Sequence, residues 1–201
     1  DQPRSRGLGD VYKRQLLIGW MGMPDAEEEY TNKTIDEGWQ HCLTVPRELR
    51  VKAGKIFQYP AKELERLRKE KTILDDEKSI VEVRVAVNEG FDLLIEDIAV
   101  TDRSFQISMG GQMLFKYENE IAEIGFSEIA GAGRNKRKAK VSELNNIRIL
   151  ADTSAVELYL NDGEIVFSTR YYPDREDLQL KVKGGKFRGN LWNLRKMIFT
   201  K

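Results

Sequence analysis

The sequence predicts an all-β protein, and three observations lead to this fold class. Short runs alternate apolar and polar residues, as at 81–87, where valine occupies every second position. Turn-forming pairs such as Gly110-Gly111 and Asp162-Gly163 separate these runs. No helical pattern interrupts them from residue 79 onward. Together they indicate an antiparallel β-sandwich over 73–201, a span that suits a single domain.

The composition excludes several classes of protein. The 201 residues include 33 basic and 33 acidic side chains, so the net charge is zero and a nucleic-acid partner is not expected. No apolar run reaches the ~20 residues of a membrane-spanning helix. The single cysteine excludes an internal disulfide and fits the reducing cytoplasm, which is the expected location.

Residues 1–15 form a polar lead without periodicity. Their end resembles translated sequencing-adapter read-through, so we expect a non-native or disordered segment; a natural disordered tail is the alternative.

Residues 16–59 are expected to form short strands with long polar connections. The run 16–23 predicts a buried strand closed by Pro24, and 38–45 predicts a second strand that ends at Pro46. A hairpin is expected at 49–59. Such strands suit a propeller blade, which cannot bury its faces alone.

Residues 60–72 are expected to form a linker helix. Pro60 suits the first helical position, and 61–71 are good helix formers. Leu64 and Leu67 share one face, while Glu65 can pair with Lys69 one turn later.

The strands of the sandwich follow from alternation. Their expected positions are 81–87, 91–95, 105–109, 113–117, 147–151, 156–160, 165–172, 178–182 and 189–199.

Three runs of residues together resemble glycoside hydrolase family 32, the invertase and sucrose-6-phosphate hydrolase family. They are Ile18-Gly19-Trp20-Met21-Gly22; 38–49 with Pro46-Arg47-Glu48-Leu49, continuing to Leu67-Arg68; and 151–173 with Asn161-Asp162-Gly163-Glu164 and Arg170-Tyr171-Tyr172-Pro173. The resemblance implies a five-bladed β-propeller, a short linker and a C-terminal β-sandwich. It also implies retaining hydrolysis of β-fructofuranosyl bonds in sucrose or sucrose 6-phosphate, and no cofactor.

The catalytic motifs of that family are missing from this chain. Retaining hydrolysis needs two carboxyl groups about 5–5.5 Å apart. The family supplies them in Asn-Asp-Pro and Glu-Cys motifs, with a further Asp in Arg-Asp-Pro, and none of these occurs here. We therefore expect no catalytic residue in this chain, only the last part of the propeller with the sandwich, and no activity of the chain alone.

Trp20 is the candidate substrate-binding residue, because the resemblance implies that its ring forms a wall of the fructose pocket. A tryptophan packed between blades is the alternative. Trp39 and Gln40 are expected to pack, and the lone His41 is expected to be structural. Cys42 is expected to behave as a small buried hydrophobe.

Arg47 and Glu48 are interpreted as ion-pair anchors between propeller and sandwich, with a remote role in shaping the pocket as the alternative. No metal site is expected, because no His, Cys or acidic cluster has ligand spacing. The acidic run 27–29 and the basic run 134–140 are interpreted as solvated surface. Gly131-Ala132-Gly133 lacks the context of a dinucleotide site.

Two other classes of function stay open. A carbohydrate-binding module would use exposed rings, for which Tyr171, Tyr172, Phe187 and Trp192 are candidates. A structural or oligomerisation domain is the other class. The expected partners are a fructoside, the missing propeller blades and a second copy in a homodimer.

Overall fold

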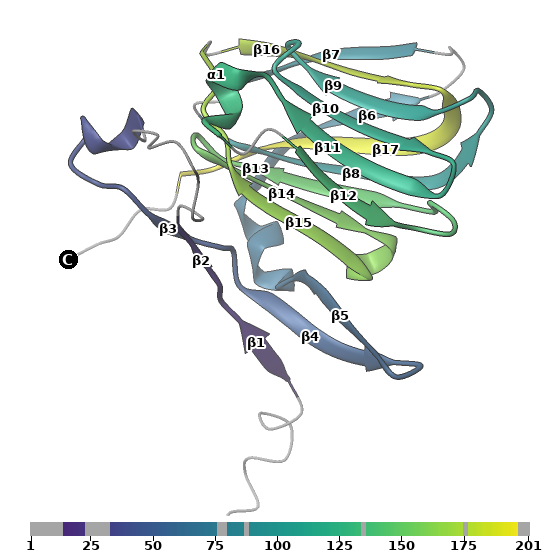
Figure 1. Ribbon diagram of the computed structural model, residues 1–201, viewed down its shortest axis with the longest axis horizontal. Coiled ribbons are helices and arrows are strands. Elements are labelled where there is room, and N and C mark those ends of the chain that lie inside the picture. Colours follow the sequence, from purple (N-terminus) through teal and green to yellow (C-terminus); the bar gives the residue numbers. More distant parts are fainter. Residues whose placement is uncertain are drawn as a thin grey trace, which may run out of the picture.

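A computed structural model describes residues 14–22, 33–75, 80–86, 89–133, 136–174 and 177–196. Almost all of its regular structure is β-strand, so the all-β prediction is confirmed. Two stacked sheets form the upper part of Figure 1, and a smaller group of strands lies beneath and beside them. No helix in these ranges is long and apolar enough to cross a membrane.

The sandwich consists of two antiparallel six-stranded sheets within the described residues. The first sheet has the order β12 (Lys136–Lys140), β11 (Ile121–Phe126), β10 (Met113–Glu118), β9 (Phe105–Met109), β16 (Asp177–Lys183) and β7 (Ile80–Ala86). The second sheet has the order β15 (Ile165–Arg170), β14 (Ala155–Leu160), β13 (Ile147–Ala151), β8 (Phe91–Val100), β17 (Gly185–Leu194) and β6 (Arg68–Asp75).

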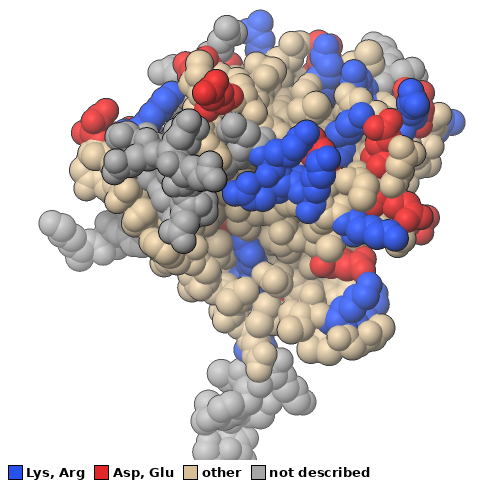
Figure 2. Space-filling model, in the orientation of Figure 1, with Lys and Arg blue, Asp and Glu red and all other residues tan. Residues whose placement is uncertain are grey.

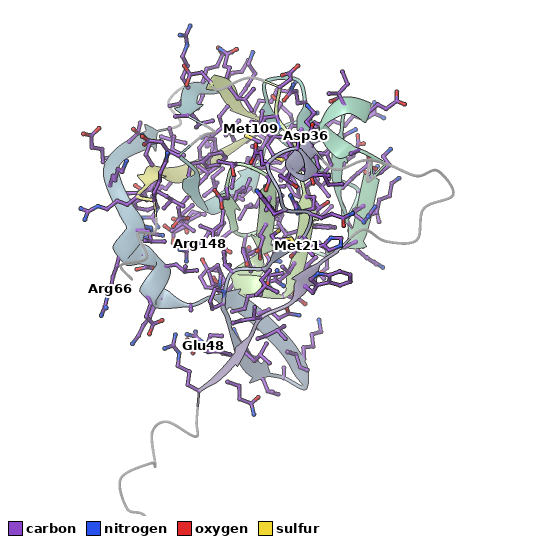
Figure 3. All side chains as sticks on the ribbon, turned by 90° about the vertical axis from the view of Figure 1, so that its left-hand side faces the viewer. Met21, Asp36, Glu48, Arg66, Met109 and Arg148 are labelled. Carbon is purple, nitrogen blue, oxygen red and sulfur yellow. The ribbon has the colours of Figure 1, made fainter. Side chains whose placement is uncertain are left out.

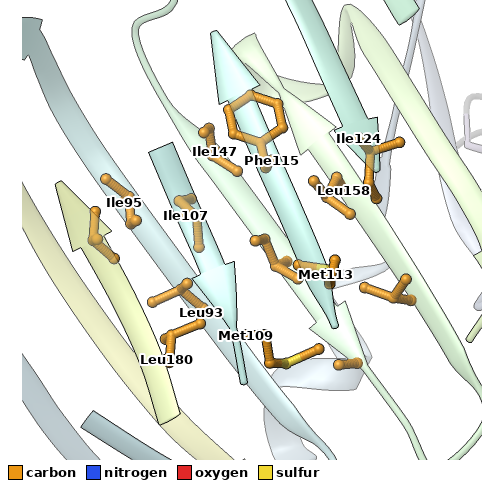
Figure 4. Packing of buried hydrophobic residues seen from close by; sticks show 14 of the residues in the cluster. Leu93, Ile95, Ile107, Met109, Met113, Phe115, Ile124, Ile147, Leu158 and Leu180 are labelled. Atoms are coloured by element: carbon orange, nitrogen blue, oxygen red, sulfur yellow. The ribbon is translucent and has the colours of Figure 1, made fainter. Parts of the chain in front are cut away.

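The core lies between these sheets and follows the alternation in the sequence. Every second residue of β9 and of the first half of β10 is buried, including Ile107, Met109 and Phe115. Leu93 and Leu158 meet them from the opposite sheet (Figure 4). Because side chains alternate across a strand, the polar residues between them reach the outer face of each sheet.

Several strand boundaries differ from the expectation. The expected strands from 81 to 182 are present, but β11 and β12 were not predicted, and a four-residue helix, α1 (Glu128–Gly131), follows β11. The turn at 161–163 is a 3₁₀ segment, η4 (Asn161–Gly163), in which Asn161 and Asp162 have positive φ angles.

The strands before residue 60 are shorter and more exposed than predicted. The hairpin is confirmed as β4 (Arg47–Lys52) and β5 (Lys55–Pro60), turning at Ala53-Gly54, and β1 (Gln15–Leu17) pairs with β4. The predicted strand at 16–23 is divided between the end of β1 and β2 (Trp20–Met21), and the predicted strand at 38–45 shrinks to β3 (Cys42–Leu43), which pairs with β2.

The prediction of a buried strand at 16–23 is wrong for the residues that the structure describes there. Leu16 is 54% exposed and Trp20 is 66% exposed, whereas Met21 is buried. These strands lie at the margin of the molecule, where the described residues offer few neighbours to cover them (Figure 1).

The linker helix is shorter than predicted. It is a 3₁₀ helix, η3 (Lys62–Leu67), and Pro60 ends β5 instead of opening the helix. Arg68 begins β6, which pairs with β17 along the edge of the second sheet. Pairing with β17 therefore overrides the helix propensity of residues 68–71.

The outer face of the second sheet is buried and charged over β13, β14 and β15. All six residues of β14 except Ala155 are buried, so Glu157 and Tyr159 are covered although they point away from the core. Arg148 on β13 and Arg170 on β15 share this face, to judge from the pairing register. The segment before residue 68 covers it, and this covered face is where the two parts of the chain meet.

Gly163 tests this contact directly. A Cβ there would lie 1.9 Å from the backbone oxygen of Gln58 in β5, and the φ angle is +89°. Gly111, at φ +73°, has open space instead. We expect Gly163→Ala to lower the free energy of unfolding by about 1–3 kcal/mol more than Gly111→Ala. Urea denaturation measures both, and equal losses would mean that this approach of β5 is not required.

Tyr171 allows a stabilising substitution. Its hydroxyl is buried without a hydrogen-bond partner among the described residues, and burial raises its pKa. We expect Tyr171→Phe to raise the free energy of unfolding by about 1 kcal/mol at pH 8.

Above about pH 10 the advantage of Tyr171→Phe should grow, because the unfolded chain then ionises a tyrosine that the folded chain keeps neutral. At pH 8, Tyr117→Phe is the matched control, since the Tyr117 hydroxyl donates to the Ser142 oxygen at 3.1 Å. Denaturation curves at both pH values decide, and a destabilised Tyr171→Phe would contradict the expectation.

Candidate functional site

Arg47 joins the hairpin to the sandwich through a buried ion pair. Its guanidinium donates to the Glu157 carboxylate from Nε at 3.1 Å and from Nη2 in a shorter contact. The same Nε lies 3.1 Å from the Tyr159 hydroxyl, and Nη1 donates to Gln58 at 3.1 Å. The Val45 amide occupies the other Glu157 oxygen at 2.8 Å. This network satisfies a carboxylate that is 3% exposed.

The proton on Tyr159 is held in the same network. Burial, together with the adjacent Glu157 carboxylate, raises the pKa of Tyr159 above its usual range. The hydroxyl therefore stays protonated and donates to Glu157. The Tyr159 ring also packs edge-to-face on the ring of Tyr59 in β5, with ring centroids 5.9 Å apart.

The anchor interpretation holds for Arg47 but not for Glu48. Glu48 pairs with Arg14 at 3.2 Å and with Arg50 at 3.1 Å, both within the part of the chain before the sandwich. Figure 3 shows Glu48 below the junction, whereas Arg148 and Met21 lie at its level. The reason is alternation, because adjacent residues of a strand point to opposite faces.

A second buried pair fixes the linker side of this face. Arg148 donates to Asp92 at 3.0 and 2.8 Å, and Arg68 donates to the same carboxylate at 2.7 Å. The Arg68 guanidinium also lies 3.8 Å from the centre of the Trp192 ring. Arg68 therefore attaches the start of β6, directly after η3, to β8 and β17 of the second sheet.

Trp20, the predicted sugar-pocket wall, lies on the exposed margin of β2. Its ring meets the His41 ring edge-on, at 4.9 Å between centroids and 74° between planes. His41 is exposed, and within the described ranges no three His, Cys, Asp or Glu side chains gather as metal ligands. The substrate role of Trp20 stays a prediction.

Trp39 packs against the guanidinium of Arg170 and does not lie in a hydrophobic core. Its ring lies 4.9 Å from the Arg170 guanidinium and is 38% exposed. The Gln40 side chain is exposed, although its backbone oxygen is used. The packing prediction is therefore met in part for Trp39 and is wrong for the Gln40 side chain.

A hollow of about 460 Å³ separates β2 and β3 from the sandwich. Trp39 and Cys42 line it from one side, Leu64 from η3, and Asp152 and Glu157 from the sandwich. Burial raises the pKa of the half-buried Cys42 thiol, and the nearby Arg170 opposes part of that rise. At neutral pH the thiol is therefore protonated, but Cys42 is only partly buried and not fully buried as predicted.

The buried carboxylates of the described chain are all occupied by arginines. Asp92 is bound by Arg148 and Arg68, and Glu157 by Arg47. A carboxylate held in this way is not available to attack a sugar or to protonate a leaving group. The geometry thus offers a joint between two parts of the chain rather than a catalytic pair.

The rings that would serve a carbohydrate-binding surface are not exposed in a row. Tyr171, Tyr172 and Phe187 are buried, and Arg68 covers a face of Trp192. This arrangement disfavours the carbohydrate-binding alternative, which needs accessible aromatic faces.

Lys136–Lys140 of the predicted basic run form β12, an edge strand of the first sheet. Lys136 and Lys138 both pair with Glu123, at 2.8 and 3.0 Å. Figure 2 shows basic side chains gathered on this side of the molecule with acidic ones among them. A lysine-rich edge is a common protection against strand pairing between molecules. Residues 134–135 and the acidic run 27–29 lie outside the described residues.

Sequence reasoning missed Glu157, Tyr159 and Arg170 as parts of the joint. In β14 the order Val156-Glu157-Leu158-Tyr159 alternates like a strand with one solvated face. The available signal was the single charged residue in each of three strands that are otherwise largely apolar, namely Arg148, Glu157 and Arg170.

Two family models match the chain. The model described as Glycosyl hydrolases family 32 N-terminal domain matches residues 5–60, and Glycosyl hydrolases family 32 C terminal matches residues 63–194. Sucrose-6-phosphate hydrolase of Bacillus subtilis is 34% identical over 170 residues, which cover 83% of this chain and 35% of the relative. The same enzyme of Staphylococcus xylosus is 30% identical, with 86% of this chain and 37% of the relative covered.

Solved structures share the fold. Sucrose-6-phosphate hydrolase of Lactobacillus gasseri matches with a TM-score of 0.76 at 19% identity, over 92% of this chain and 39% of the other. A mutant GH32 β-fructofuranosidase of Bombyx mori in complex with sucrose matches with a TM-score of 0.73 at 19% identity, over 91% and 38%. The chain thus spans little more than a third of the length of these relatives.

The ion pair at the joint leads to a stability prediction. We expect Arg47→Met to lower the free energy of unfolding by about 3–5 kcal/mol, because Glu157 would remain buried without its cation. Arg50→Met is the control: Arg50 pairs with Glu48 on the surface and is 68% exposed, so a change within about 1 kcal/mol is expected. Thermal melting followed by circular dichroism measures both variants.

Adding Glu157→Gln to Arg47→Met should recover part of the loss, because the uncompensated charge disappears. An Arg47→Met variant that melts together with Arg50→Met would show that the pair does not hold the joint.

Proposed function

Since the chain belongs to glycosyl hydrolase family 32, we propose that it forms the rear part of a retaining β-fructofuranosidase that hydrolyses sucrose or sucrose 6-phosphate. The names of its relatives support this substrate class: two are sucrose-6-phosphate hydrolases, and a structural neighbour was solved with sucrose. The hydrolysis needs carboxyl groups and water, so no cofactor takes part.

One observation carries the proposal, namely where the exposed apolar residues lie. Large apolar side chains exposed by more than half are concentrated in the segment before residue 61, whereas in the described part of the sandwich they are Ile73 and Ile129. Before residue 61 they are Leu16, Ile18, Trp20, Leu43, Val51 and Ile56. Such a surface is typical of a face that another part of the protein covers. The remaining propeller blades are the proposed cover.

The two catalytic carboxyl groups determine which part of the proposed enzyme performs the chemistry. The nucleophile and the general acid are contributed by the part of the enzyme upstream of the matched region. The described chain contributes Trp20, whose ring is 66% exposed and is proposed to cover the apolar side of the fructose ring. The sandwich contributes the charged face that holds these strands in place.

Location and assembly are proposed on narrower grounds. The single cysteine supports the cytoplasm. A homodimer is proposed through the sandwich, where the edge strands β6 and β7 carry exposed Ile73 and Ile80.

A fusion tests the function. Residues 16–194 replace the matched region of the Bacillus subtilis enzyme, and release of reducing sugar from sucrose and from sucrose 6-phosphate is measured. We expect hydrolysis by the fusion and none above background by this chain alone. In the fusion, Trp20→Ala should raise KM by about tenfold, since a stacking wall is worth about 1–2 kcal/mol.

Ile129→Ala is the matched control for loss of apolar area away from Trp20, because Ile129 is 63% exposed and lies on the sandwich in α1; it should leave KM unchanged. A fusion that melts cooperatively yet cleaves neither sugar would contradict the proposed function, and so would hydrolysis by the chain alone.

A further inference from the structure

Arg170 is a buried cation whose partners are neutral in the described part of the chain. Its side chain lies at the end of β15 and the residue is 1% exposed. Nε donates to the Ser154 backbone oxygen at 3.0 Å, within the sandwich. Nη1 donates to the Gln40 backbone oxygen at 2.8 Å, and Nη2 to the Thr34 hydroxyl at 3.3 Å. One guanidinium therefore spans both parts of the chain.

The same group is enclosed by two aromatic rings. The Arg170 guanidinium carbon lies 4.9 Å from the Trp39 ring centre and 5.1 Å from that of Tyr172. A buried guanidinium is costly unless its donors are used. A planar fork can satisfy several acceptors in fixed directions, which an ammonium group cannot reproduce. The contacts of Arg170 therefore fix the relative positions of its three oxygen acceptors and do not neutralise a partner charge.

The segment that Arg170 holds is a closed turn. Thr34, buried at one end, accepts the Trp39 amide on its backbone oxygen at 3.1 Å, and the Glu37 amide binds the same oxygen at 3.1 Å. Gln40 lies at the other end. By binding Thr34 and Gln40 together, Arg170 fixes the point at which the turn leads into β3.

The residues that follow Gln40 connect this turn to Trp20. His41 follows Gln40 and touches the Trp20 ring edge-on. Cys42 and Leu43 then pair with Met21 and Trp20 in the two-residue ladder of β2 and β3. Gly19 and Thr44 extend this pairing, since the Thr44 amide donates to the Gly19 oxygen at 2.7 Å and the Gly19 amide donates to the Thr44 hydroxyl at 2.8 Å. So short a pair of strands has little rigidity of its own, and the position of Trp20 therefore depends on how β3 is held.

We propose that Arg170 is a positioning residue of the sandwich, which determines the position of Trp20 through the 34–40 turn. The consequence for sugar binding rests on the proposed function; the positioning itself does not. Arg47 cannot replace it, because Arg47 holds β4 and its own partners lie on β14, β5 and β15.

Fluorine NMR of the full chain tests the positioning. The chain has three tryptophans, so 5-fluorotryptophan gives three resonances, which Trp→Phe variants assign to Trp20, Trp39 and Trp192. We expect Arg170→Lys to shift the resonances of Trp39, which it touches, and of Trp20, which it does not. The Trp192 resonance should stay in place.

Arg188→Lys is the matched control, because Arg188 is exposed and pairs with Asp97 on the surface. It should leave all three resonances unchanged. A shift of Trp39 without a shift of Trp20 in Arg170→Lys would overturn the proposal. If that variant loses its dispersed signals, Thr34→Val decides, since it removes one acceptor and keeps the side-chain shape; an unmoved Trp20 there overturns the proposal too.

The fusion enzyme tests the consequence. With Arg170→Lys we expect KM to rise about fivefold while kcat changes less than about twofold, because uniform sugar binding is lost. An unchanged KM beside a shifted Trp20 signal would overturn the link to sugar binding. An unsubstituted fusion without activity would count against the proposed function only, since the NMR result would still decide the positioning.

Discussion

The buried pair between Arg47 and Glu157 is the constraint on which the arrangement of the two parts depends. A carboxylate on the covered face of a sheet is strongly destabilising unless a cation and further donors reach it. Glu157 receives the Arg47 guanidinium, the Tyr159 hydroxyl and the Val45 amide. Because two of these donors belong to the segment before residue 61, the sandwich reaches its full stability only with that segment in place.

The fold of the sandwich could be predicted, because alternation reports directly on which side of a strand is buried. The joint could not be predicted in the same way. Arg47 was identified as an anchor from its apolar neighbours, but its partner lies 110 residues later in the chain. In sequence, Glu157 looks like the solvated half of an alternating strand. Only the packing of the hairpin on the outer face of the sheet makes it a buried charge.

Two of the expectations that failed have a common physical origin in tertiary context. Residues 68–71 favour a helix by composition, yet they form β6 because the edge of β17 offers backbone partners. The apolar run at 16–23 predicts burial, yet Leu16 and Trp20 are exposed. In the first case a neighbouring strand is present and changes the local preference. In the case of the 16–23 run, the described chain offers no surface against which Leu16 and Trp20 could be buried.

Three separate contacts together determine how the front strands sit on the sandwich. One is the Arg47 pair at β4, and another is the Arg170 fork at the 34–40 turn. At the far end of the hairpin, Lys55 pairs with Glu164 at 2.6 Å, beside the close approach of Gly163 to β5. One contact leaves a body free to rotate and two leave it free to swing about the line that joins them. Three contacts that involve β4, the 34–40 turn and the hairpin tip remove this freedom as well, provided that they do not lie on one line. A sandwich that is itself rigid can in this way hold short, weakly paired strands in a defined orientation without touching a substrate.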